Sequence, residues 1–151
     1  MSVITPSGRY LRGAHKRVPW TDANETITTS NTLVAINISE VGITHGIAML
    51  RRANDYANRY VVNFNEVAAK SWSVGGRNSA TGSTDKGYSR ELGDSELTDF
   101  AFDSSGLYIA LIDIYVNTAT NQVYTYWKSN SGNRTLNAQM AISLYKGSTV
   151  S

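Results

Sequence analysis

The sequence predicts an all-β fold, an antiparallel β-sandwich that is jelly-roll-like and ends in a C-terminal meander. Ser, Thr and Asn supply 45 of the 151 residues, and these side chains compete with the helix backbone for hydrogen bonds and favour turns and strand faces. No long segment has a convincing helical period, whereas several short ones alternate between apolar and polar residues. A sheet with one apolar face must bury that face on another layer, so roughly six to eight such strands predict a sandwich.

Length and charge limit the possible organisation. The chain is long enough for one domain, and we expect a basic N-terminal arm over 1–25 followed by a single β-sandwich domain over 26–151. A net charge of +2 gives no reason to expect a nucleic acid or a membrane as partner. Residues 1–12 lack the apolar region of a signal peptide, so none is expected. Because the chain has no cysteine, disulfides and thiolate metal sites are excluded.

In the first half of the domain, residues 32–38 predict a strand, and residues 46–52 fit either a strand or a short helix. Residues 51–59 predict a turn, which a helical turn could replace. Residues 60–65 alternate with a period of two, which predicts a half-buried strand. Residues 66–74 are interpreted as a strand or one arm of a hairpin.

The longest irregular region covers residues 73–96, which contain five Gly and five Ser. A structureless connection of this length is uncommon in a compact domain and is usually functional or mobile. A short buried strand around Tyr88 would make the region more ordinary.

The C-terminal third has the clearest pattern. Residues 106–116 are apolar except for Asp113, which predicts a strand covered on both faces. A turn at 117–121, a strand at 122–128 and a second turn at 129–133 follow. The last strand places one set of apolar side chains on a single face: Leu136, Ala138, Met140, Ile142 and Leu144. Three successive strands with short turns predict an antiparallel meander.

The N-terminal arm is the first candidate for a partner contact. It carries several bases and no acid over residues 1–20, with Trp20 as an apolar anchor. One interpretation is an electrostatic clasp on an acidic partner, and the alternative is a solvated, frayed terminus. The predicted partner-binding residues are Arg9, Arg12, Lys16, Arg17 and Trp20.

An acidic segment over 91–103 holds five carboxylates and no base: Glu91, Asp94, Glu96, Asp99 and Asp103. Oxygen-rich clusters suit calcium, but the EF-hand spacing is absent and residues 99–103 alternate like a strand with an acidic face. We therefore favour a solvated face, or one paired with the basic arm of a neighbouring subunit, and expect no metal site.

Catalysis finds little support in the sequence. The two histidines, His15 and His45, lie far apart along the chain, and no nucleophile motif accompanies either. Asp113 could be a perturbed carboxylate of a glycoside hydrolase, but a buried Asp also pairs with an Arg or caps a turn. We expect a non-catalytic protein without a cofactor.

Aromatic residues provide a better indication of binding. Tyr124 and Tyr126 share one face of a strand whose other face carries Val123, Thr125 and Trp127. Exposed rings near Asn and Gln suit sugar stacking or a protein interface, although Tyr also simply fills the wet face of a sheet. The predicted ligand-binding residues are Trp72, Arg77, Tyr88, Tyr124, Tyr126, Asn137 and Gln139, the last two on a strand expected beside the tyrosines.

Three segments together resemble the small jelly-roll structural proteins of tailed-phage virions, such as decoration proteins, tail-tip knobs and receptor-binding domains. They are the arm GRYLRGAHKRVPW, the loop GGRNSATGSTDKG and the predicted meander over 106–146. The resemblance implies a virion protein assembled in the host cytoplasm. It also implies a symmetric homo-oligomer, with a trimer favoured, that binds other virion proteins or a host-surface glycan. The alternative is a carbohydrate-binding, lectin-like module.

Overall fold

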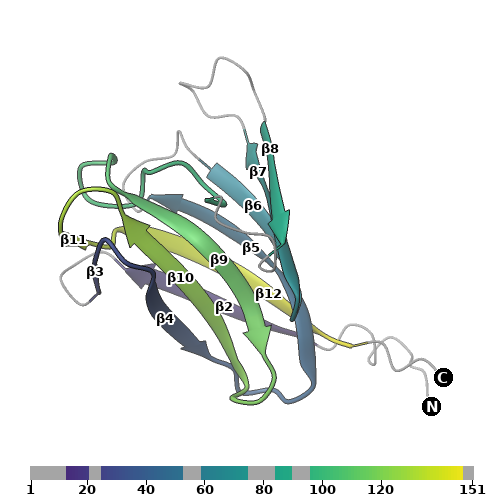
Figure 1. The fold of residues 1–151 in the computed structure, drawn as a ribbon. Helices are drawn as coiled ribbons and strands as arrows, with labels where there is room; N and C mark the ends of the chain where they lie inside the picture. Colours follow the sequence, from purple (N-terminus) through teal and green to yellow (C-terminus); the bar gives the residue numbers. More distant parts are fainter. Residues whose placement is uncertain (1–12, 21–24, 53–58, 75–83, 90–95, 148–151) are drawn as a thin grey trace, which may run out of the picture.

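The computed structural model describes residues 13–20, 25–52, 59–74, 84–89 and 96–147, with the backbone alone for 13–20, 72–74 and 84–89. This part of the chain contains eleven strands and no helix (Figure 1). An apolar helix of membrane-spanning length is therefore absent from the described residues. The predicted all-β sandwich is confirmed, with more strands than the sequence pattern predicted.

The larger sheet has six strands in the order β2-β12-β5-β6-β7-β8, and every neighbouring pair is antiparallel. Its strands are β2 (Gly13–Trp20), β12 (Ala138–Lys146), β5 (Ile43–Arg52), β6 (Arg59–Phe64), β7 (Ala68–Val74) and β8 (Thr84–Ser89). The stretch that fitted a strand or a short helix is thus strand β5, and β8 lies inside the region predicted to be irregular. Residues 13–20 of the predicted arm form an edge strand of this sheet.

The smaller sheet has three antiparallel strands in the order β4-β10-β9. They are β4 (Thr32–Asn37), β10 (Gln122–Ser129) and β9 (Ile109–Asn117), and they lie in front of the larger sheet in Figure 1. Two short strands, β3 (Thr26–Ile27) and β11 (Arg134–Thr135), form a separate pair. The two main sheets bury their apolar faces against each other, as the sandwich argument requires.

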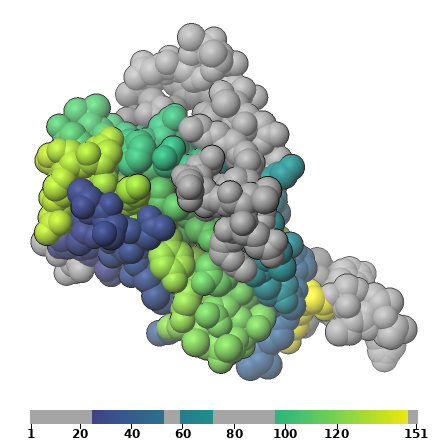
Figure 2. All heavy atoms as spheres, viewed as in Figure 1, coloured from purple at the N-terminus to yellow at the C-terminus, as the bar shows by residue number. Residues whose placement is uncertain are grey.

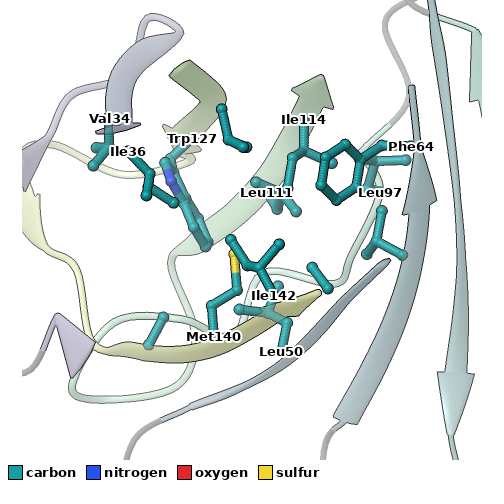
Figure 3. Packing of buried hydrophobic residues seen from close by; sticks show 14 of the residues in the cluster. Val34, Ile36, Leu50, Phe64, Leu97, Leu111, Ile114, Trp127, Met140 and Ile142 are labelled. Atoms are coloured by element: carbon teal, nitrogen blue, oxygen red, sulfur yellow. The ribbon is translucent and has the colours of Figure 1, made fainter. Parts of the chain in front are cut away.

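The core between the sheets is built by alternate residues of each strand. In β6, Tyr60, Val62 and Phe64 are buried, which confirms the period of two read from the sequence. In β10 the fully buried Trp127 projects into the core, and Figure 3 shows its ring directed toward Met140 of β12. The Phe102 ring packs edge-on against Trp127, with centroids 6.0 Å apart. Large apolar side chains from both sheets therefore share one core.

The predicted C-terminal meander is wrong in its third strand. β9 and β10 do form a hairpin, but β12 joins the other sheet, between β2 and β5. Between β10 and β12 the chain passes from one sheet to the other through β11, which pairs with β3. Just before β12, the Asn137 N–H donates to the Phe102 carbonyl at 2.8 Å. The free edge of β10 is occupied by β4. Because the apolar faces of β10 and β12 need each other as cover, they lie in opposite layers and not side by side.

Candidate binding face on the three-stranded sheet

Three tyrosines gather on the outer face of the three-stranded sheet. The core takes Val123, Thr125 and Trp127 of β10, so strand alternation turns Tyr124 and Tyr126 outward. Tyr115 of β9 is the direct cross-strand partner of Tyr124. All three tyrosines are partly exposed, and in Figure 2 atoms of β9 and β10, green to yellow-green, occupy the lower middle of the visible face.

The three rings are in mutual contact. The Tyr115 and Tyr124 centroids lie 5.6 Å apart with planes inclined by 56°, and the Tyr124 and Tyr126 rings meet edge to face at 6.3 Å. The Tyr115 and Tyr126 rings are nearly parallel, at 19° and 6.2 Å. Aromatic pairs at these separations attract one another beyond their simple burial. The cluster is therefore held in place by its own contacts. We call this surface, with Asp113, the tyrosine face.

Asp113 reaches this face through a β-bulge. Tyr126 pairs with Asp113, but the next residue, Trp127, pairs with Leu111, so β9 carries one extra residue at Ile112. The bulge switches the inward positions of β9, which lets Leu111 face the core while Asp113 faces outward beside Tyr126. Asp113 is only 7% exposed, and its Oδ1 accepts the Ile114 N–H at 2.8 Å. A carboxylate is thus fixed at the foot of the aromatic cluster.

Amide and apolar groups border the tyrosines. In the row beyond Tyr124, Gln122 pairs with Asn37 of β4 and with Asn117 of β9. The Gln122 Nε2 donates to the Asn37 Oδ1 at 2.8 Å. At the other end Leu33, opposite Tyr126, is 43% exposed. The face therefore combines aromatic, aliphatic, amide and carboxylate groups.

A buried hydrogen-bond chain supports the tyrosines from below. The Trp127 indole Nε1–H donates to the Thr125 hydroxyl at 2.8 Å, and that hydroxyl donates to the Val34 carbonyl at 2.6 Å. Thr125 lies between Tyr124 and Tyr126 in the chain and links β10 to β4. A site carried by strands with satisfied polar groups changes little when a ligand binds.

The structure assembles only part of the ligand-binding set predicted from the sequence. Tyr124 and Tyr126 are brought together, and Tyr115 joins them. The sequence signal for Tyr115 was its alternation with Asp113 and Asn117 in an otherwise apolar strand. The prediction that Asn137 and Gln139 lie on a neighbouring strand is wrong, because β12 belongs to the other sheet.

Asn137 and Gln139 have structural surroundings of their own. Asn137 is buried where the chain crosses between the sheets. The Gln139 Oε1 accepts a hydrogen bond from the Arg51 guanidinium on β5. Both side chains therefore belong to the larger sheet and its approach segment.

Of the other predicted residues, those that the structure describes belong to the larger sheet. Arg9, Arg12 and Arg77 fall outside the described residues. The backbones of Lys16, Arg17 and Trp20 lie in β2, that of Trp72 in β7 and that of Tyr88 in β8, all strands of the larger sheet.

Residues 99–103 do not form the strand that their alternation indicated, since only Asp103 makes an isolated bridge, to Leu136. Of the described acidic side chains, Asp99 is exposed and Glu96 is half-buried. Asp103 is buried, and it accepts hydrogen bonds from the Leu107 and Tyr108 N–H groups at 2.9 and 2.7 Å. Burial raises the pKa of Asp103, but hydrogen bonds from the Ser105 hydroxyl and from the backbone N–H groups of Tyr108, Leu107 and Ser105 together lower it below its usual value. Asp103 therefore shapes the loop before β9. The Asp99 carboxylate accepts a hydrogen bond from the Tyr60 hydroxyl. Glu91 and Asp94 lie outside the described residues.

Within the described ranges no three His, Asp or Glu side chains come close enough to hold a metal ion. His15 lies in β2, where only the backbone is described, and His45 lies on β5 of the larger sheet.

Comparisons of the chain with protein-family models, curated proteins and solved structures give no match.

Proposed function

We propose that the protein is a non-catalytic binding domain that recognises carbohydrate, such as a host-surface glycan, through the tyrosine face. The observation that carries this proposal is the contact cluster of Tyr115, Tyr124 and Tyr126 beside the carboxylate of Asp113. It unites, on one rigid sheet, the two kinds of group that a sugar ring requires.

A pyranose ring has an apolar side of C–H groups and a rim of hydroxyls. The C–H side packs on the negative face of an aromatic ring, which the tyrosines supply. The hydroxyls require acceptors and donors around that ring, and the Asp113 carboxylate, the tyrosine hydroxyls and the Gln122–Asn37 amide pair supply both. The mixture of groups fits a sugar better than a purely apolar protein partner.

The carboxylate composition of the face favours binding over hydrolysis. Glycoside hydrolases generally place two carboxyl groups on either side of the scissile bond. On the described part of the tyrosine face, Asp113 is the sole acidic side chain. It is also engaged with the backbone of its own strand, which suits a fixed hydrogen-bond acceptor.

An open sheet face binds each sugar weakly, so repetition of the face would strengthen attachment. The trimer and the virion setting implied by the sequence resemblance stay predictions. If three copies assemble, three tyrosine faces would engage a surface at a high effective concentration.

A glycan array tests the proposal with the full chain and the variant Tyr124→Ala/Tyr126→Ala. We expect wild-type protein to bind a subset of glycans. The affinity of the double variant for them should fall by at least about tenfold, because aromatic side chains that a ligand covers contribute most of the binding energy in such contacts. Val41→Ala is the matched control, because Val41 is 71% exposed on the connection between β4 and β5. Absence of glycan binding by the wild type, or equal binding by the double variant, would overturn the proposal.

A further inference from the structure

A second candidate site lies on the outer face of the larger sheet. It is a depression of about 610 Å³ that crosses β12, β5, β6 and β7. This volume falls in the range of small-molecule sites. We call it the His45 depression, and it is lined by His45, Gly46, Ile47, Asn63, Phe64, Asn65, Ala68, Ala69, Lys70 and Tyr145.

Strand register explains why these side chains converge. Ile47, Asn63 and Lys70 are direct cross-strand neighbours in one row, and all three are exposed. The next row along the strands contains Tyr145 opposite His45. Small residues leave room for the depression. Ala68 lines it, and Gly87, the cross-strand partner of Lys70, has no side chain to fill it.

His45 is held in a defined position. Its ring stacks on Tyr145 with centroids 5.5 Å apart and an interplanar angle of 24°. Its Nδ1 lies 3.0 Å from the Thr44 hydroxyl oxygen. When that hydroxyl donates to Nδ1, the ring proton resides on Nε2, which is then a donor for a ligand. The wall of the depression is therefore organised before any ligand arrives.

The electrostatics favour an anion. Lys70 has no ion-pair partner within the described ranges, and the described lining contains no Asp or Glu. One ammonium group accompanied by neutral donors matches a monoanion such as a carboxylate. Phosphate dianions are typically held by arginine forks or several bases, which this lining lacks.

The rest of the lining fits a polar carbon skeleton. Ile47 and the Tyr145 ring supply apolar surface, and Asn63 supplies an amide that can both donate and accept. A carboxylate joined to a hydroxylated ring satisfies all of these groups at once. We propose that the His45 depression binds an acidic sugar, with the carboxylate on Lys70 and the sugar ring against Ile47 and Tyr145. This site is independent of the tyrosine face, which lies on the other sheet.

The test is a titration of the full chain followed by amide shifts in ¹H–¹⁵N NMR spectra. Methyl glucuronide and methyl glucoside are the matched probes, because they differ only in a carboxylate replacing a hydroxymethyl group. We expect the glucuronide to shift Ile47, Asn63 and Lys70 saturably, and the glucoside to bind about tenfold more weakly, as loss of a charged hydrogen bond implies. Equal binding of the two probes, or no saturable shift with the glucuronide, would contradict the proposal.

Inorganic phosphate is the third probe. We expect it to bind more weakly than the glucuronide. If phosphate bound the same residues as tightly, the depression would be a general anion site and the sugar assignment would be wrong.

Variants then locate the site. Lys70→Met should weaken glucuronide binding about five- to tenfold, and Lys70→Arg should retain most of it. Lys128→Met is the matched control, because Lys128 is an exposed lysine on β10 of the other sheet. Tyr124→Ala/Tyr126→Ala should leave the shifts around Lys70 unchanged, so failure of the tyrosine-face proposal and failure of this one are separable. A Lys70→Met protein that bound like the wild type would overturn the assignment.

Discussion

The Asp103 Oδ1 accepts the backbone N–H of Tyr108 at 2.7 Å, which ties the loop before β9 to a buried carboxylate. Ser105 and Leu107 donate to the same side chain. Because these donors hold the carboxylate in its charged form, Asp103 folds the loop that leads the chain into the smaller sheet.

Replacement of Asp103 should therefore destabilise the protein. Asp103→Ala removes the carboxylate oxygens that accept all of these hydrogen bonds, and we expect a loss of about 2–4 kcal/mol in the free energy of unfolding. Asp103→Asn retains one acceptor oxygen and should cost less. Urea denaturation monitored by tryptophan fluorescence measures both, and an unchanged midpoint for Asp103→Ala would contradict the role given to this carboxylate.

The lowered pKa of Asp103 also fixes the sign of a pH effect. A carboxyl group whose folded pKa lies below the usual value of 3.8 stabilises the fold fully above that value, and the contribution is lost as the pH falls through the folded pKa. The wild type should therefore lose stability below about pH 4 more steeply than Asp103→Asn. Denaturant midpoints between pH 2 and about 5 give the comparison, and parallel curves would show that Asp103 is not responsible.

The Trp127–Thr125–Val34 chain predicts a contrast between two substitutions of similar size. Thr125→Val removes the buried hydroxyl that accepts the Trp127 N–H and donates to the Val34 carbonyl, so we expect a loss of about 2–3 kcal/mol. Thr125→Ser keeps the hydroxyl and removes one methyl group, which should cost about 1 kcal/mol. Chemical denaturation of both variants tests this order, and a Val variant at least as stable as the Ser variant would refute it.

Gly46 predicts an overpacking effect. A Cβ at this position would lie 2.6 Å from the Phe64 Cζ and 2.8 Å from the Ser143 carbonyl oxygen. The carbonyl belongs to the β5–β12 ladder and cannot move away, so Gly46→Ala should cost about 1–3 kcal/mol. Phe64→Leu in the same chain relieves only the ring contact and should restore part of the loss. Thermal denaturation of the single and double variants decides, and full stability of Gly46→Ala would show that the ladder yields.

The tyrosine face predicts that binding and stability separate. Tyr124 and Tyr126 are partly exposed, so each replacement by Ala removes aromatic contacts worth about 1 kcal/mol, whereas glycan binding should fall much further. Tyr126→Phe keeps the ring and should retain more binding than Tyr126→Ala. Thermal denaturation beside the array measurement separates the two effects. Parallel losses in both would mean that the tyrosines serve only the fold.

The sequence by itself determined the fold class and the apolar faces of individual strands. Alternation at Tyr60, Val62 and Phe64 predicted which side of β6 is buried, and the same period identified the buried set of β12. It also separated Tyr124 and Tyr126 from Trp127. These properties follow from the geometry of a single strand, in which successive side chains point to opposite faces.

Only the tertiary structure decided which strands are neighbours and which outward residues meet. Strand order depends on which apolar faces cover one another across the core, so β12 lies opposite β10 instead of beside it. The bulge at Ile112 shifts the register and brings Asp113 and Tyr115 to the same face as Tyr124 and Tyr126. The His45 depression joins residues from four strands and has no local signature, because its members are adjacent only through cross-strand pairing.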